Sequence, residues 1–369
     1  MWTDIIQIGN HTAKNRIVYP PISTNWGGTD GLPTEGTYKY YANQARGGCG
    51  FILVEGTAVA PEGKGSSNSL LIHNSIYKVE QYYSPIASAI REHGAIAYLQ
   101  LMHAGGQANS QKTGQPAVSP SGIPCKSINS KPISLTTDDI YRIIDDFTYA
   151  SVVAHHSGFD GVELHLSHGY LLHEFISART NFRTDEFGGS SFKSRFKIVD
   201  LIIQSIREHS PIDISVRISL DDFILGGISS QDYPAIAKIL DNYPLSCIHT
   251  TCGIYDTSDI KHLKMSQGYF QDACKQFRQY VDSPVITVGN IMTIEEAEIL
   301  LNDDVCDLVS IGRAQLADPF LVQKTLSKQK INSCTKCKKC MYLKYGREML
   351  KCPIRDLYLD VDEACSSSL

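Results

Sequence analysis

The sequence has no surplus of basic residues. Its 369 residues include 34 Lys and Arg against 39 Asp and Glu, which gives a formal net charge of -5. A protein that binds a nucleic-acid backbone needs a positive face, so this balance argues against nucleic acid as a partner. Long apolar runs are also missing, and none reaches the length that crosses a membrane. We therefore expect no nucleic-acid partner and no membrane-spanning segment.

The first residues, MWTDIIQIGNHTAKNR, carry an acidic residue early and lack an uninterrupted apolar core. They do not have the pattern of a secretory leader. Cysteines number 11, an odd count, and most of them fall inside apparent strands and helices. The odd number of cysteines and their positions indicate reduced thiols rather than a disulfide framework. Together these absences predict a cytoplasmic protein.

What the sequence does contain is a repeated alternation of short apolar runs and amphipathic stretches. The apolar runs begin at Ile17, Phe51, Ala95, Asp160, Asp213, Ser246, Pro284 and Asp307. Each is almost continuously apolar, as are parallel strands that are covered on both faces. Stretches of helical period lie between them, and Thr137 and Thr293 stand where helix N-caps are expected. Eight strands that alternate with helices predict a (β/α)8 TIM barrel.

A doubly wound open sheet would show the same alternation. The number of units and the absence of GxGxxG after any strand favour the barrel. Residues 105–134, after the third run, are rich in Gly, Ser, Pro and Asn and are predicted to form an active-site loop with short structure of its own. The pattern stops near residue 330. This predicts an α/β barrel over residues 1–330 and a short Cys-rich C-terminal tail over residues 331–369.

The carboxyl ends of barrel strands form the face that carries active sites. The seventh and eighth runs end in TVGNI and SIGRA, which place Gly289, Asn290, Gly312 and Arg313 on that face. Glycines there let backbone amides approach an anion, and an arginine neutralises it, as in a phosphate site. The same glycines could instead form tight turns alone, and both interpretations stay open.

Two polar residues, Gln100 and Arg217, lie inside apolar runs. An unpaired amide or guanidinium in such a place is costly, so each needs a partner in the barrel mouth. An ion pair within the protein would satisfy Arg217. A bound polar ring with donors and acceptors would satisfy both residues together.

The segment VELHLSHGYLLHEF places His165, His168, Tyr170 and His173 close together. Imidazoles three residues apart can bind a metal, which would define a metal-dependent, non-redox barrel enzyme, and they can also be purely structural. We favour a third interpretation, in which His165 and His168 hold a substrate oxygen and Tyr170 acts as an acid beside them. His173 lies past the turn and is predicted to pack structurally.

The run HLSHGYLLHEFISARTNFRTDEFGGS closely resembles the signature of the Old Yellow Enzyme family of flavin oxidoreductases. The segments KNRIVYPP, YYANQARGGCGFILVEGTAV, QLMHAGGQA, SVRIS and SIGRAQLADPF follow in the family's order, so the resemblance covers roughly Ile8 to Lys324. It implies an FMN-containing barrel with NADH or NADPH as the reductant. The implied substrate is a small molecule with an activated C=C bond, an α,β-unsaturated carbonyl or nitro compound.

The resemblance also implies roles by position. The segment against the flavin is matched by Pro21, Ile22 and Ser23. Contacts to the flavin ring are matched by Gly56, Gln100 and Arg217, and the phosphate end by Gly289, Asn290, Gly312 and Arg313. The pair that binds the substrate oxygen is matched by His165 and His168. Tyr170 matches the residue that protonates the substrate after hydride transfer from flavin N5.

Some positions depart from the family's pattern. Ser23 stands where members usually carry Cys or Thr, and Asn25 stands where smaller bacterial members often have Tyr. With Ser23, a hydroxyl bond to the O4 region of the flavin stays possible, whereas a redox-tuning thiol is missing. Asn25 alters the substrate pocket, and the resemblance does not identify the physiological alkene. It also leaves open the preference for NADH or NADPH and the association of copies into a homo-oligomer.

The tail INSCTKCKKCMYLKYGREMLKCPI resembles the iron-sulfur segment of the dienoyl-CoA reductase and trimethylamine dehydrogenase branch. That branch has the spacing CxxCxxxC before a fourth Cys. Here Cys334 and Cys337 keep the first spacing, Cys340 arrives one residue early, and Cys352 follows. The four thiols could hold a [4Fe-4S] cluster or zinc, or could stay free. The alternative function is therefore an iron-sulfur flavoenzyme of that branch.

Overall fold

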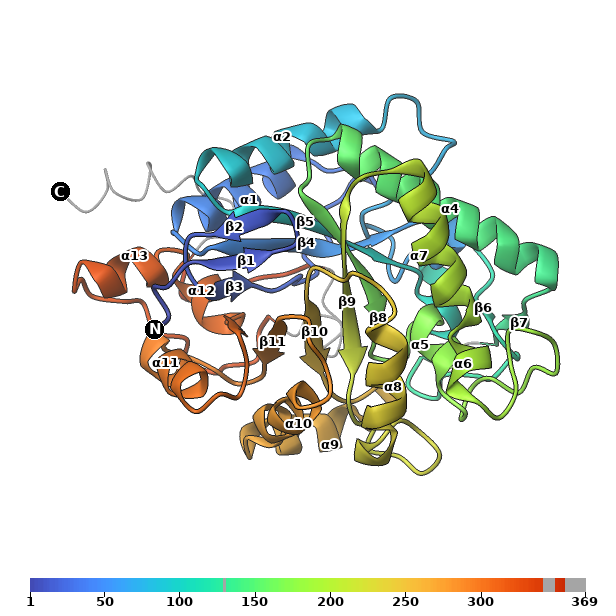
Figure 1. Cartoon of the computed structure of the whole chain (residues 1–369). Coiled ribbons are helices and arrows are strands. Elements are labelled where there is room, and N and C mark those ends of the chain that lie inside the picture. Colours follow the sequence, from blue (N-terminus) through green and yellow to red (C-terminus); the bar gives the residue numbers. More distant parts are fainter. Residues whose placement is uncertain (129–130, 341–348, 356–369) are drawn as a thin grey trace.

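The computed structural model describes residues 1–128, 131–340 and 349–355, and its centre is a closed barrel (Figure 1). Neighbouring strands follow the order β10-β11-β12-β3-β4-β5-β8-β9 and pair in parallel. The strands are β3 (Ile17–Tyr19), β4 (Phe51–Ala58), β5 (Ile96–Met102), β8 (Gly161–Leu166), β9 (Asp213–Ser219), β10 (Ile248–Thr251), β11 (Val285–Val288) and β12 (Leu308–Ser310). Each predicted apolar run contributes one strand. The predicted TIM barrel is confirmed, and the open-sheet alternative is wrong.

Helices surround the barrel (Figure 1). The longer ones are α1 (Glu35–Arg46), α2 (Glu80–Glu92), α4 (Thr137–His156), α7 (Lys197–His209), α8 (Tyr233–Leu240), α9 (Ser258–Ser266), α10 (Tyr269–Arg278) and α11 (Ile294–Asn302). Thr293 caps α11 as predicted, because its side chain accepts a hydrogen bond from the Glu296 amide. The predicted cap of α4 is wrong by one residue. Thr136 accepts from the Asp139 amide, and Thr137 is the first helical residue.

Shorter elements lie in the connections. They are α3 (Ser110–Thr113), α5 (Leu171–Ile176), α6 (Phe192–Arg195), α12 (Arg313–Ala317), α13 (Leu321–Leu326), β6 (Val118–Ser119), β7 (Ile133–Ser134), and the 3-10 helices η1 (Pro61–Gly63), η2 (Gly105–Gln107), η3 (Ser230–Asp232) and η4 (Tyr255–Thr257). The loop 105–134 contains η2, α3 and the parallel pair of β6 and β7, so its predicted short structure is confirmed. Across the described ranges, no helix combines the length and the apolar character that crossing a membrane demands.

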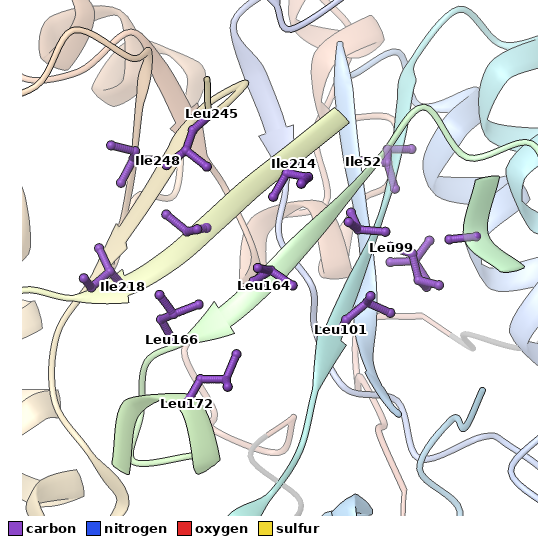
Figure 2. Packing of buried hydrophobic residues seen from close by; sticks show 14 of the residues in the cluster. Ile52, Leu99, Leu101, Leu164, Leu166, Leu172, Ile214, Ile218, Leu245 and Ile248 are labelled. Carbon is purple, nitrogen blue, oxygen red and sulfur yellow. The ribbon is translucent and has the colours of Figure 1, made fainter. Parts of the chain in front are cut away.

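Alternate residues of each barrel strand face the helices. Figure 2 shows this for the buried cluster that includes Leu99 and Leu101 of β5 and Leu164 and Leu166 of β8. Successive side chains of a strand point to opposite faces, so Gln100 and His165, which lie between these leucines, point into the barrel. Because side chains alternate in direction along each strand, the polar residues between the leucines point into the barrel.

The opposite end of the barrel is closed by an N-terminal hairpin of β1 (Ile6–Ile8) and β2 (His11–Ala13). Its residues Ile8 and Ala13 belong to a buried cluster with Phe51 and Ile96, which begin β4 and β5. The sequence prediction missed this hairpin, because each strand has only three residues. Apolar side chains thus fill the lower barrel, and the carboxyl ends of the strands form the open end.

Candidate functional site

His165 and His168 form a close pair at the end of β8. Nε2 of His165 lies 3.3 Å from Nδ1 of His168, and Nε2 of His168 lies 3.2 Å from Oγ1 of Thr251. Burial and then the charge of Arg217 lower the pKa of His165, while burial and then Lys261 lower the pKa of His168. Both imidazoles are therefore neutral near pH 7. A neutral imidazole keeps one N–H, which can be donated to a substrate oxygen.

The backbone at His168 is left-handed, with φ of 64°. This conformation is uncommon outside glycine, so neighbouring groups must hold it. The His168 amide donates to Oγ of Ser219 at 3.1 Å, and Nε2 of Gln107 donates to the His168 carbonyl at 2.8 Å. These two contacts, from β9 and η2, hold the turn that brings the His168 ring next to His165.

His173 lies apart from this pair. Its Nδ1 accepts a hydrogen bond from the Gly169 amide at 3.1 Å, and its Nε2 lies 3.1 Å from Oδ2 of Asp222. Both ring nitrogens are thus used within the protein. His173 is a structural residue, as its position past the turn predicts.

Tyr170 lies directly beside the imidazole pair, with its ring centre 4.9 Å from that of His165. Its hydroxyl lies 3.1 Å from the hydroxyl of Tyr255, at the start of η4. The sequence prediction did not find Tyr255 or Lys261, because it drew nothing from the end of the sixth apolar run. Both residues follow that run, SCIHTT, on the face that carries active sites, and this position was the signal available.

A polar layer lies inside the barrel below the imidazole pair. Nε2 of Gln100 donates to Oε1 of Glu163 at 2.7 Å, and Nδ1 of His249 lies 3.0 Å from Oε2 of the same carboxylate. In contrast, no described residue is a hydrogen-bond partner for Nε of Arg217, Nε2 of His249 or Oγ of Ser310, although all three atoms are buried. Unpaired buried polar groups are costly, so each of these three atoms needs a partner, which water or a polar ligand can supply.

The ends of β11 and β12 bring the predicted phosphate residues together. Arg313 donates from a terminal guanidinium nitrogen to Oδ1 of Asn290 at 2.8 Å. Gly289 has φ of 127°, and a Cβ there would lie only 3.1 Å from Cδ2 of Phe270. A Cβ on Gly312 would lie 3.2 Å from Pro20 Cγ. Both glycines leave backbone uncovered where a side chain would press on its neighbours, and binding of a phosphate by this group stays a prediction.

The segment of Pro21, Ile22 and Ser23 follows β3 and ends with Ser23 exposed at the barrel mouth. Next to it, the amide and Oγ1 of Thr24 donate to the two carboxylate oxygens of Glu55 at 2.7 and 2.6 Å. Burial raises the pKa of Glu55 to about 7. These bonds tie the segment to the end of β4.

Gly56 and Asn25 lie close to the same segment. A Cβ on Gly56 would lie 2.7 Å from Sδ of Met102 and 3.2 Å from Oε1 of Gln100, so a side chain there would displace its neighbours. Asn25 is buried, has φ of 57°, and accepts a hydrogen bond from Oγ of Ser66. Gly56 therefore lies close to Gln100, and contact of either residue with a flavin stays a prediction.

The tail cysteines gather around one cavity. It is lined by Cys334, Cys337, Cys340 and Cys352 together with Arg313. Within residues 1–128, 131–340 and 349–355, no three His, Cys, Asp or Glu side chains are arranged to hold a metal ion. Leu350 donates its amide to the Thr24 carbonyl at 2.9 Å, and Arg355 donates Nε to the Leu316 carbonyl at 3.0 Å. This part of the tail packs on the barrel, and its binding of a cluster or zinc stays a prediction.

The barrel thus presents buried polar atoms without a described partner, and backbone that glycines leave uncovered. The chain belongs to the NADH:flavin oxidoreductase / NADH oxidase family, whose model matches residues 4–332. It is 36% identical over 340 residues to the NADH oxidase of Thermoanaerobacter brockii, covering 90% of this chain and 52% of that protein. It is 33% identical over 317 residues to the NADPH dehydrogenase of Bacillus cytotoxicus, covering 85% and 88%.

Solved structures agree with this assignment. The old yellow enzyme homologue from Zymomonas mobilis is 27% identical, covers 90% of this chain and 94% of that chain, and superposes with a TM-score of 0.74. Membership of the Old Yellow Enzyme family is therefore confirmed. A 2-naphthoyl-CoA reductase in complex with 2-naphthoyl-CoA shares the fold, with 24% identity, a TM-score of 0.89, and coverage of 96% of this chain and 56% of that chain. The chain thus spans about half the length of some relatives.

Proposed function

We propose that this chain is an FMN-dependent reductase of activated C=C bonds that uses NADH or NADPH as the reductant. The observation that carries the proposal is the pair of imidazole nitrogens 3.3 Å apart, on His165 and His168, beside Tyr170. An oxygen about 3 Å from both nitrogens would accept two hydrogen bonds. The carbonyl or nitro oxygen of an activated alkene fits this position, because it is conjugated with the C=C bond.

The two imidazoles would act on charge that develops during the reaction. Hydrogen bonds to the oxygen draw electron density away from the β-carbon, which then accepts hydride more readily. Negative charge builds up on the oxygen as the hydride adds, and the two donors stabilise it. Because both imidazoles are held at the end of β8, little reorganisation is needed.

The cofactor fit is supported by the unpaired atoms of Arg217, His249 and Ser310, which offer polar contacts to a ring in the barrel mouth. The residues that would hold the ring are Pro21, Ile22, Ser23, Gly56, Gln100 and Arg217, and those that would hold the phosphate are Gly289, Asn290, Gly312 and Arg313. When bound, FMN supplies the hydride that it has accepted from the nicotinamide.

Tyr170 would complete the reduction. Its phenol donates a proton to the α-carbon, so one hydride and one proton add across the C=C bond. A phenol with a pKa near 10 can protonate a carbanion, which is far more basic. Tyr170 then regains a proton before the next turnover.

One spectrum of the purified protein tests the proposal. We expect a flavin absorption band that bleaches when NADPH is added without oxygen and returns when 2-cyclohexen-1-one is added. A colourless protein that cannot be reconstituted with FMN would contradict it. If the band bleaches but does not return with enones or nitroalkenes, the protein binds a flavin, and activated alkenes are not its substrates.

The second candidate is an iron-sulfur flavoenzyme, and the four cysteines around one cavity favour it. Arg313 lines the same cavity and bonds to Asn290, so the cavity adjoins the proposed phosphate end. Four thiolates of this kind can hold a [4Fe-4S] cluster, and they can also hold zinc. When bound, such a cluster passes single electrons.

Metal analysis of protein purified without oxygen tests this candidate. We expect about four irons per chain with matching sulfide, and loss of iron in Cys337→Ser. Cys125→Ser is the control, because Cys125 is a free thiol outside the tail. Zinc in place of iron, or no metal at all, would reject the iron-sulfur function while leaving the alkene reductase intact.

A further inference from the structure

Tyr255 connects Tyr170 to a cavity on its other side. The two hydroxyls lie 3.1 Å apart, and the ring centres are 5.8 Å apart. Tyr255 also lines a cavity of about 280 Å³ between the loop 105–134 and the ends of β8, β9 and β10. The cavity has room for several water molecules. Tyr255 therefore touches both the proposed acid and this space.

The cavity is lined by groups that can hold water and carry protons. Gln107 is buried, and no described residue is a partner for its Oε1. Glu174 is also buried, and burial raises the pKa of its carboxyl well above the usual range. Asp256 and Arg179 are among the other polar residues that line it. An ordered water would satisfy Gln107, as buried waters usually do for unpaired groups.

We propose that Tyr255 is a positioning residue that returns a proton to Tyr170 from water in this cavity. The proposal rests on the proposed function, in which Tyr170 protonates the α-carbon. As the C–H bond forms and the Tyr170 O–H bond breaks, the Tyr170 oxygen takes the proton of Tyr255, and Tyr255 takes one from a cavity water that exchanges with solvent. Each turnover thus consumes one solvent proton and needs no further oxidant or reductant.

Two properties suit Tyr255 to this role. Burial raises its pKa, so the phenol holds its proton until Tyr170 draws it away. A hydroxyl donates and accepts at the same time, which lets a single side chain pass a proton along. Phe at this position would keep the ring and remove only that ability.

The experiment measures how fast reduced enzyme is reoxidised by 2-cyclohexen-1-one in mixtures of H2O and D2O. Tyr255→Phe should slow reoxidation about tenfold, the effect of one lost hydrogen bond, while flavin reduction by NADPH keeps its wild-type rate. The wild-type rate should fall along a curve with deuterium content, because more than one proton moves in the same step, and the Tyr255→Phe rate should fall along a straight line. Tyr243→Phe is the matched control, because Tyr243 donates to Asp200 at 2.9 Å, away from the site.

The outcomes separate the two proposals. Wild-type reoxidation in both Tyr170→Phe and Tyr255→Phe would reject Tyr170 as the acid, and with it the proposed mechanism. Slow reoxidation in Tyr170→Phe alone, with the curved deuterium dependence kept in Tyr255→Phe, would overturn the relay only. Tyr255→His restores a group that donates and accepts, so it should recover part of the rate. A His variant as slow as the Phe variant would also count against the relay.

Discussion

Nδ1 of His249 lies 3.0 Å from the carboxylate of Glu163, and both side chains are completely buried in the barrel. The same carboxylate accepts a hydrogen bond from Gln100, on the opposite side. It also lies near Arg217, whose positive charge it partly balances. One buried anion therefore organises three strands below the imidazole pair, and its removal should be costly.

Glu163→Gln should lower the free energy of unfolding by about 3–5 kcal/mol, because it leaves the buried Arg217 charge without its nearby anion. Urea unfolding at pH 7 measures the change. Glu186→Gln is the control, since Glu186 is exposed and accepts a hydrogen bond from the Tyr141 hydroxyl. This variant should change stability by less than about 1 kcal/mol. Equal losses in the two variants would show that Glu163 has no special structural role.

Tyr170→Phe should slow reoxidation of the reduced enzyme by an enone about a hundredfold, because a positioned acid contributes at least that much. Reduction of the flavin by NADPH should hardly change, since that half-reaction needs no proton donor to carbon. Rapid-mixing absorbance of each half-reaction gives both rates. Equal losses in the two half-reactions would argue against Tyr170 as the acid.

Gly289→Ala should reduce the amount of FMN that stays bound per chain. Its φ of 127° is unfavourable for alanine, and the new Cβ would press on Phe270 at 3.1 Å. Such strain costs about 1–3 kcal/mol. Gly226→Ala is a matched control, because Gly226 also has positive φ, of 80°, yet a Cβ there meets nothing within 4 Å. Flavin absorbance after dialysis measures the effect. Equal flavin loss in both variants would show that Gly289 has no special role in binding the phosphate.

Glu55 should make stability depend on pH. Burial raises its pKa from 4.5 to about 7, so folding favours the protonated form. Its contribution is fully present below pH 4.5 and is lost as the pH rises through 7, a change of about 3 kcal/mol. Glu55→Gln cannot ionise, so wild type should lose stability relative to this variant between pH 4.5 and pH 8. Parallel urea-unfolding profiles for the two proteins would contradict a raised pKa.

The barrel could be predicted because its strands are simple in sequence. The run FILVEGTA is buried along its whole length as β4, and the other runs have the same character. Thr136 and Thr137 show the limit of local patterns, because two adjacent threonines can each serve as a cap and only the chain geometry selects one. The strands and their order along the chain follow from local chemistry, whereas the exact residue at which a helix begins does not.

The candidate site could be predicted only in part. His165, His168 and Tyr170 lie within six residues of sequence, so their proximity in space could be predicted. The left-handed turn at His168 depends on Ser219 and Gln107, which come from distant segments. Tyr255 reaches Tyr170 only because β10 lies beside β9 in the closed barrel, a relationship that no local pattern contains.

The hairpin of β1 and β2 also constrains the kinetics. With apolar side chains filling that end of the barrel, the proposed function would bring nicotinamide and alkene to a bound flavin through the same mouth. Two reagents that share one binding place bind in turn, so each would leave before the other enters. For the proposed reductase we therefore expect ping-pong kinetics, in which an excess of either reagent slows turnover by occupying the place of the other.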